Sequence, residues 1–265
     1  MKILFFADIV GRIGREAVKQ TLPGLKTEFA PDFIIANCEN LAQGKGITER
    51  TIDEMLTAGI DLFTSGNHLW DRREIFEILS NPQYAERIIR PANYPPSTPG
   101  DGWKLFTVGA KKVLVVNFLG RVFSEVLTDE PFRLFDKILA ENAHHNPAAV
   151  LIDFHGEATS EKIAFGWHAD GRASAVFGTH THVATRDERI LPEGTAYITD
   201  VGMCGLRDGV IGVDRAPIIR NFMNQLPVRH ELPSSGEAVV NALFIEIASD
   251  GKATAIKHIT KYVTI

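Results

Sequence analysis

Short apolar runs recur along the chain, separated by loops and by longer segments that favour helices. Runs of about five residues that are rich in Val, Ile and Phe are typical of strands buried on both faces of a sheet. The predicted strands are residues 3–7, 32–36, 60–64, 105–108, 113–116, 150–154, 173–177 and 196–199. The predicted helices are residues 16–29, a segment from Thr48, a segment from Asp71 to about Leu79, and residues 132–140 and 159–169.

Local signals refine these elements. Residues 10–15 contain two glycines and are expected to form a loop, and Pro23 is expected to break or kink the helix that follows. Thr48 is a candidate N-cap, and Asp71 is a candidate cap for the helix after it. Residues 202–212 contain four glycines, which indicates a loop that is either mobile or closely packed.

Two pairs of segments predict β-hairpins. Residues 105–108 and 113–116 flank one turn, and the alternating segments 238–247 and 253–263 flank another, which is expected to close an edge of the fold. The order of elements favours an α/β fold in which two mixed β-sheets pack as a sandwich flanked by helices. A simple doubly wound sheet is the alternative. Since no linker or repeat interrupts the pattern, residues 1–265 are predicted to form a single domain.

The composition narrows the class of protein. With 265 residues, 45% of them hydrophobic, the chain can bury a core without disulfides or a structural metal. The net charge of −5 argues against stable nucleic-acid complexes and against binding to anionic membranes, but it leaves a small phosphorylated substrate open. Cys38 and Cys204 are expected to be free thiols. No apolar run approaches the ~20 residues that cross a bilayer, so we expect a cytoplasmic protein.

Two histidines follow the predicted strand 173–177, in the sequence Gly178-Thr179-His180-Thr181-His182. In an extended chain residues i and i+2 share a face, so both imidazoles are expected to reach a common centre. Alone, the pair is weak evidence for a metal site, because such pairs are more often polar residues that cap a strand or face water.

Polar groups also follow four other apolar runs. Each has an ordinary structural explanation of its own, such as Asp8 capping a helix or Asn67 favouring a tight turn. In α/β sheets, however, ligands collect where the carboxyl ends of strands converge. The coincidence therefore predicts one site, whose candidate ligands are Asp8, Glu39, Asn40, Asn67, His155, His180 and His182.

The chemistry of these groups favours metal ions. Oxygen and imidazole donors without a thiolate suit Mn, Fe or Zn. Seven ligands are too many for one tetrahedral ion and fit two ions bridged by a carboxylate, for which Glu39 is the natural candidate. Two such cations ~3.5–4 Å apart clamp a phosphoryl group and supply hydroxide at neutral pH. We expect two divalent or trivalent transition-metal ions, with iron or manganese favoured over zinc.

The motifs resemble those of a known superfamily, the calcineurin-like metallophosphoesterases, and within it the YmdB-type subfamily. The resemblance extends from Asp8 to about Gly212. The blocks that carry it are Asp8-Ile9-Val10-Gly11, Asn37-Cys38-Glu39-Asn40, Gly66-Asn67-His68-Leu69-Trp70-Asp71, Asp153-Phe154-His155-Gly156-Glu157, Gly178-Thr179-His180-Thr181-His182 and Thr199-Asp200-Val201-Gly202-Met203. It implies a 2′,3′-cyclic-nucleotide 2′-phosphodiesterase, a dinuclear enzyme with a cyclic nucleotide as its substrate.

Two positions depart from the wider superfamily but agree with the subfamily. Val10 stands where a histidine ligand is usual, and Glu39 followed by Asn40 stands where the bridging acid is usually Asp in a Gly-Asp block. Asn40 is a candidate replacement for the lost ligand. Fewer nitrogen donors leave the identity of the metal open.

The resemblance also implies roles for the individual residues. One ion would be held by Asp8, Glu39, Asn40 and His182, and the other by Glu39, Asn67, His155 and His180. His68 would be the catalytic acid, protonating the 2′ oxygen as metal-held hydroxide attacks phosphorus, and a hydrogen bond to a ligand is its alternative role. Asp200 and Glu157 would orient ligand histidines. Arg12, Arg15 and Arg121 would either face the phosphate or lie in solvent.

Three rival functions remain at this stage. The same site fits a broad phosphomonoesterase or phosphodiesterase, because the ligands leave the alcohol side of the substrate unspecified. A non-catalytic nucleotide-binding regulator and a purely structural metal site are the other two. Closed homo-oligomers are common among proteins, so a homo-oligomer is compatible with the sequence.

Overall fold

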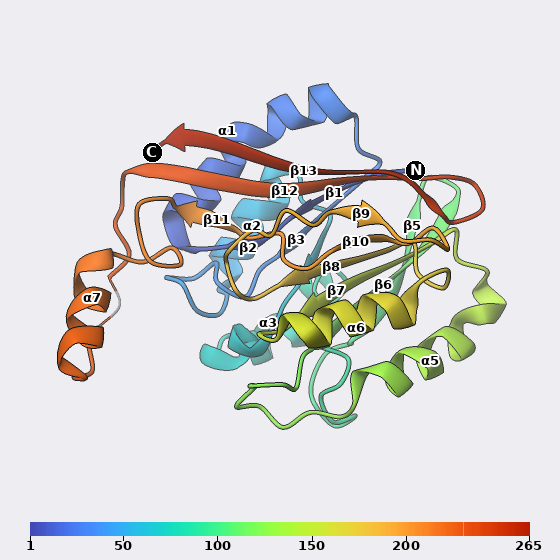
Figure 1. Ribbon diagram of the computed structural model, residues 1–265, viewed down its shortest axis with the longest axis horizontal. Coiled ribbons are helices and arrows are strands. Elements are labelled where there is room, and N and C mark those ends of the chain that lie inside the picture. The colour runs from blue at the N-terminus through green and yellow to red at the C-terminus, as the bar shows by residue number, and fades with distance from the viewer. Residues whose placement is uncertain (230) are drawn as a thin grey trace.

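The computed structural model describes residues 1–229 and 231–265. It contains a seven-stranded sheet in the order β2-β11-β12-β1-β3-β4, with β13 paired to the other edge of β12. A six-stranded sheet has the order β5-β6-β7-β8-β10-β9 (Figure 1). The first sheet is built from β1 (Lys2–Phe6), β2 (Asp8–Ile9), β3 (Phe33–Asn37), β4 (Leu62–Thr64), β11 (Met203–Leu206), β12 (Glu237–Ile247) and β13 (Ala253–Thr264). The second is built from β5 (Trp103–Val108), β6 (Lys111–Leu119), β7 (Ala149–His155), β8 (Ala175–Thr179), β9 (Arg189–Ile190) and β10 (Ala196–Ile198).

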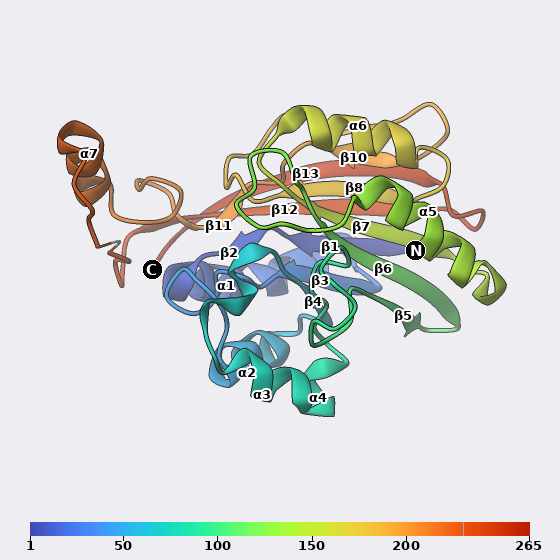
Figure 2. The same cartoon turned by 90° about the horizontal axis from the view of Figure 1, so that it is seen from below.

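Helices cover the outer faces of both sheets. Figure 2 shows α1 to α4 on one side of the molecule and α5 and α6 on the other. The α-helices are α1 (Gly11–Phe29), α2 (Glu49–Ala58), α3 (Ile75–Ser80), α4 (Pro82–Ala85), α5 (Pro131–Asn142), α6 (Thr159–Ala169) and α7 (Arg215–Asn224), and the short 3-10 helices are η1 (Asn67–Asp71) and η2 (Ala143–His145). The predicted sandwich of two mixed sheets flanked by helices is therefore confirmed.

Alternating side chains of β1 explain why its apolar run is continuous. Ile3 and Phe5 face the second sheet, where the Phe5 ring lies 4.1 Å from that of Phe177 between ring centroids. Leu4 and Phe6 face the other way and pack in the core beneath α1. Because both faces are covered, every position of the strand favours an apolar residue.

Glycine and proline misled the prediction around α1. This helix begins at Gly11 rather than after a loop, because Gly14 lets the helix approach β11 closely: a Cβ at Gly14 would lie 2.2 Å from the Cys204 carbonyl oxygen. Pro23 lies inside the helix, which continues to Phe29. The Pro23 side chain is exposed, and the proline does not break the helix.

Two further expectations need correction. Asp71 does not cap α3; it lies at the end of η1, where its carboxylate contacts His68. Residues 202–212, expected to form a mobile or closely packed loop, instead contain the buried strand β11, which pairs with β2 and β12, whereas Arg207 and Ile211 beyond it are exposed. The Thr48 N-cap and both predicted hairpins are confirmed.

Among the helices of the described residues, none has the length and apolar character of a membrane-spanning segment.

Candidate metal centre

The carboxyl ends of the parallel strands bring the predicted ligands together. In the first sheet β3 runs parallel to β1 and β4, and in the second β7 runs parallel to β6 and β8. Glu39 and Asn40 follow β3, Asn67 follows β4, His155 ends β7, and His180 follows β8. Both sheets therefore contribute side chains to one end of the sandwich.

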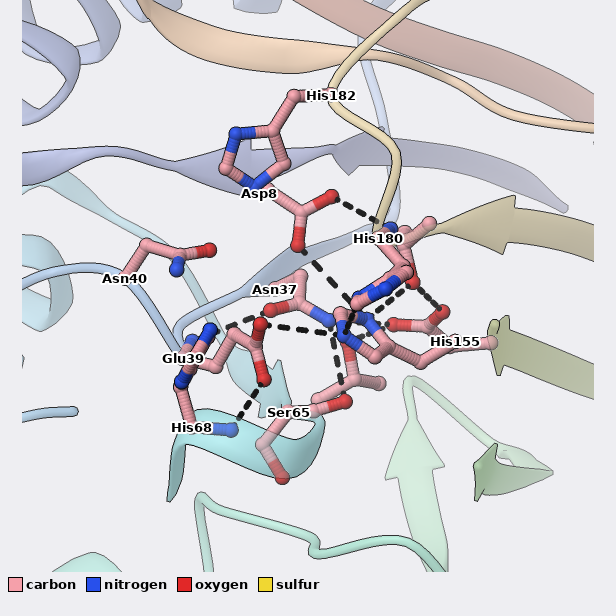
Figure 3. Close-up of polar contacts among 12 residues, drawn as sticks. Asp8, Asn37, Glu39, Asn40, Ser65, His68, His155, His180 and His182 are labelled. Atoms are coloured by element: carbon pink, nitrogen blue, oxygen red, sulfur yellow. Dashed lines mark hydrogen bonds and ion pairs between the residues drawn. The ribbon is translucent and has the colours of Figure 1, made fainter. Parts of the chain in front are cut away.

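Glu39, His155 and His180 form the centre of the site (Figure 3). Each offers one ligand atom, and these atoms all lie within 4.8 Å of one another. The His155 Nε2 atom lies 3.1 Å from Glu39 Oε1 and 3.1 Å from His180 Nδ1. Burial opposes charge on Glu39 and His155, yet their mutual attraction lowers the pKa of Glu39 and raises the pKa of His155. Burial, followed by the charge of His155, lowers the pKa of His180 to about 3, which keeps this imidazole neutral and able to bind a cation.

Three buried side-chain oxygens beside this cluster lack a hydrogen-bond partner within residues 1–229 and 231–265. They are Asp8 Oδ1, Asn40 Oδ1 and Asn67 Oδ1. The other Asp8 oxygen accepts a hydrogen bond from the His180 backbone N–H at 3.1 Å, and the Asn40 amide donates to the Gly44 carbonyl at 2.9 Å. A buried oxygen without a partner costs about 1–3 kcal/mol, and cations bound beside these oxygens would satisfy them. These residues therefore fit the predicted metal ions.

A chain of hydrogen bonds orients His155. Its Nδ1 atom lies 2.9 Å from Thr179 Oγ1, and that hydroxyl donates to Asp153 at 2.6 Å. The Thr179 oxygen therefore accepts the Nδ1 proton of His155, and loss of the Nε2 proton to make room for a metal ion would leave a lone pair facing Glu39 and His180. Asp153 also accepts hydrogen bonds from Thr64 and Asn37, and burial raises its pKa to about 6.

The two histidines after β8 reach the site through an unusual backbone rather than an extended one. The φ angles are +102° at His180 and +63° at His182, in the left-handed region that favours glycine. Thr181 between them is held by Asp200, which accepts hydrogen bonds from its backbone N–H and its hydroxyl at 3.1 and 2.8 Å. The expectation that an extended chain aims both imidazoles was wrong in its geometry, although both point into the site.

A buried lysine supports this backbone. Lys162 of α6 lies 2.6 Å from the Asp200 carboxylate and donates to the Thr179 carbonyl at 2.7 Å. Both charged side chains are 1% exposed. Asp200 thus acts on the backbone between the histidines, whereas the sequence had suggested that it orients an imidazole.

The outer nitrogens of His180 and His182 also have partners. His180 Nε2 lies 3.3 Å from a Glu157 oxygen, which agrees with the role predicted for Glu157. His182 Nδ1 lies 2.9 Å from the Ile211 carbonyl, so the glycine-rich segment after β11 positions this histidine. The His182 ring faces Asp8 (Figure 3), and burial raises the pKa of Asp8 although the nearby His182 and His155 lower it.

His68 faces a cavity beside the ligand cluster. Its backbone N–H donates to Glu39 at 2.9 Å, while its ring Nδ1 lies 2.9 Å from Asp71. The cavity has a volume of about 460 Å³ and is also lined by Asn67 and His180. The His68 ring is therefore oriented by a carboxylate and lies beside the candidate ligands.

The three arginines considered from the sequence lie elsewhere: none is among the described residues that line this cavity. Arg15 is buried against Glu54 and the Leu41 carbonyl, and Arg12 lines a groove between α1 and α2. Arg121 lines a neighbouring pocket.

Sequence reasoning missed the supporting residues Asn37, Asp153, Thr179 and Lys162. Asp153 carried a signal, because a carboxylate inside the apolar run 150–154 has to find buried partners. Lys162 carried none, since a lysine in an amphipathic helix ordinarily faces solvent.

Comparisons with known proteins identify relatives that match nearly the whole chain. A family model described as YmdB-like protein matches residues 4–259. The 2′,3′-cyclic-nucleotide 2′-phosphodiesterase of Bacillus subtilis (strain 168) is 48% identical over 252 residues, which cover 95% of this chain and 93% of that protein.

Two solved structures extend the comparison. A crystal structure described as a novel phosphatase from Mycoplasma pneumoniae has a TM-score of 0.91 and 32% identity, covering 99% of this chain and 93% of the other. A 5′-nucleotidase precursor from Thermus thermophilus has a TM-score of 0.55 and 12% identity, covering 100% of this chain and 54% of the other, and shares the fold alone.

Proposed function

The chain belongs to the YmdB-like family, and we propose that it hydrolyses 2′,3′-cyclic nucleotides to 3′-nucleotides at a dinuclear metal centre. The substrate is inferred from the name of the Bacillus subtilis relative. The observation that carries the proposal is the group of three unpartnered buried oxygens, on Asp8, Asn40 and Asn67, around Glu39, His155 and His180.

Seven side chains would hold the ions. Asp8, Glu39, Asn40 and His182 would hold one, and Glu39, Asn67, His155 and His180 the other, with Glu39 shared between them. When bound, such a pair of cations neutralises charge on a phosphoryl group and makes water nucleophilic at neutral pH. Oxygen donors outnumber nitrogen donors, which favours iron or manganese over zinc. Elemental analysis of the purified protein should give two such ions per chain, and one ion per chain would contradict the dinuclear site.

His68 would provide the proton for the leaving group. Asp71 holds the His68 Nδ1 atom, so the opposite nitrogen faces away from that carboxylate. In the proposed reaction this nitrogen donates its proton to the 2′ oxygen of the ribose as the bond between that oxygen and phosphorus breaks. The phosphate stays on the 3′ oxygen, and water supplies the added hydroxyl group.

His68→Ala tests this role. The variant should keep its metal content, because the ring is not a proposed ligand, while kcat falls by about 10²–10⁴-fold as general acid catalysis is lost. His144→Ala removes an exposed histidine outside the cavity and serves as the matched control. Unchanged kcat in His68→Ala would exclude His68 from the chemistry.

The substrate is tested by comparing turnover of 2′,3′-cyclic AMP, 3′,5′-cyclic AMP and a simple aryl phosphate. The proposal requires a preference for 2′,3′-cyclic AMP and a product that is 3′-AMP. A large preference for the aryl monoester would instead indicate a phosphomonoesterase. Binding of nucleotide without turnover by the metal-loaded protein would indicate a regulator.

A further inference from the structure

We propose that Phe123 is the residue on which the nucleobase of the substrate stacks. This inference rests on the proposed function and adds a base-binding subsite to it. Phe123 lines the same cavity of about 460 Å³ as Asn67, His68 and His180. A cavity of this size accommodates a small-molecule ligand. Among the described residues that line the cavity, Phe123 is the one Phe, Tyr or Trp side chain.

The Phe123 ring does not pack in the hydrophobic interior of the described chain. The residue is 84% exposed, which is unusual for a phenylalanine, and it belongs to none of the hydrophobic cores in the described chain. Its φ angle is +63°, in the left-handed region that side-chain-bearing residues avoid. An exposed ring held in an unfavourable backbone conformation beside a candidate active site indicates a binding contact.

The segment that carries the ring is anchored on its N-terminal side. The Glu161 carboxylate of α6 accepts hydrogen bonds from the backbone N–H groups of Arg121, at 3.0 and 3.1 Å, and Val122, at 3.1 Å. The Ser124 N–H donates to the Arg121 carbonyl at 3.2 Å, which closes a turn around Phe123. The ring is therefore positioned at the cavity before substrate arrives.

The chemistry of the cavity divides into two parts. The histidine and asparagine side chains suit a phosphoryl group and its ions, whereas Phe123 offers a flat apolar face. Every nucleobase has a π-face, so stacking on an aromatic ring is tolerant of sequence and favours purines through their larger area. The subsite thus predicts a nucleotide substrate of broad base identity rather than a phosphate ester without a base.

Phe123→Ala tests the subsite with two substrates: 2′,3′-cyclic AMP and methyl riboside 2′,3′-cyclic phosphate, which lacks a base. Stacking is worth about 5- to 150-fold per base, so KM for cyclic AMP should rise by that factor. The kcat value should change little, because the stack is the same in the ground state and in the transition state. KM for the baseless substrate should stay within about twofold, and Phe123→Trp should restore the cyclic AMP value.

Leu127→Ala is the matched control, because Leu127 is 93% exposed in the same segment but does not line this cavity. It should leave both KM values unchanged. Equal KM changes for the two substrates in Phe123→Ala, or no change for cyclic AMP, would overturn the subsite. A wild-type enzyme that turns over neither substrate would instead overturn the proposed function, and calorimetric titration with 3′-AMP would still report whether Phe123→Ala weakens nucleotide binding.

Discussion

Gly66 is the residue whose missing side chain keeps the centre of the site open. A Cβ placed there would lie 2.3 Å from both Glu39 Oε2 and His155 Nε2, the atoms at the centre of the proposed metal site. The φ angle of Gly66 is −158°, an extended conformation that any residue adopts. The requirement for glycine is therefore one of space and not of backbone freedom.

Gly66→Ala should lose metal and activity while keeping the fold, because its methyl group displaces Glu39 and His155. We expect kcat/KM to fall by at least about 100-fold, as when a catalytic group is displaced, together with substoichiometric metal in elemental analysis.

Gly24→Ala is the control, since a Cβ at Gly24, in the exposed part of α1, meets no atom of the described residues within 4 Å. That variant should be more stable by roughly 0.5–1 kcal/mol, because alanine favours a helix interior, and its activity should be unchanged. Full metal content in Gly66→Ala would show that the site does not need this space.

Individual site residues were predictable where the fold gathers them, at the carboxyl ends of the strands. Polar groups at the carboxyl ends of buried strands, such as Glu39 and His155, were predicted because they follow directly after apolar runs. The geometry at His182 was not predictable, since its left-handed backbone depends on contacts that Asp200 and Ile211 supply from distant parts of the chain. Phe123 had no signal, because an isolated exposed phenylalanine looks like any other surface residue in a sequence.

For the helices and strands, the hydrophobic pattern predicted which type of element forms, whereas glycines obscured where some elements begin and end. The predicted helix over residues 159–169 matches α6, and the boundaries of the predicted strands lie within about three residues of the observed ones. The beginning of α1 and the strand β11 were missed because Gly14 and Gly205 looked like loop residues. Both glycines allow close approach, Gly14 toward the Cys204 carbonyl and Gly205 toward Val10.

The N-terminus of α5 offers a test of helix capping. The Glu130 carboxylate accepts hydrogen bonds from the backbone N–H groups of Phe132 and Arg133 at 2.7 and 2.9 Å. Burial raises the pKa of Glu130, but the two N–H donors lower it by more. The pKa of Glu130 therefore lies below its ordinary value of 4.5. Because the folded state favours the carboxylate, its contribution is complete above pH 4.5 and is lost as the pH falls through the lowered pKa.

Glu130→Ala should therefore lower the free energy of unfolding by about 1 kcal/mol at pH 7, and the difference from wild type should shrink below pH 4.5. Urea unfolding at pH 7, 5 and 4 measures this difference. Glu141→Ala at the opposite end of α5 removes an exposed carboxylate 3.8 Å from Lys137 and should change stability by less than about 0.5 kcal/mol at each pH. A Glu130→Ala deficit that does not depend on pH would contradict capping by the carboxylate.

At the scale of the whole molecule, the layered arrangement followed from local patterns but the strand order did not. The terminal hairpin was expected at an edge, and β13 does lie there. Its partner β12 is instead an inner strand that pairs with β1, β11 and β13. This long-range pairing depends on which apolar faces fit together, which periodicity does not encode. We propose that residues 1–265 form one domain, because the core between the sheets takes residues from β1, β7 and β12 alike.

That core determines what happens when metal is removed. Ile3, Leu151 and Leu243 are fully buried between the sheets, away from the polar cluster at the strand ends. Within the cluster, Glu39 and His155 shift toward their charged forms and so compensate each other without an ion.

We therefore expect chelation to leave the far-ultraviolet circular dichroism at 25 °C unchanged. The Tm of a single cooperative transition should fall by about 5–10 °C, which is the stabilisation lost when a ligand at about 100 times its Kd is removed. Restoring iron or manganese should restore the Tm. Unfolding at 25 °C on chelation would mean that the metal holds the sheets together, and two separate transitions would contradict the single domain.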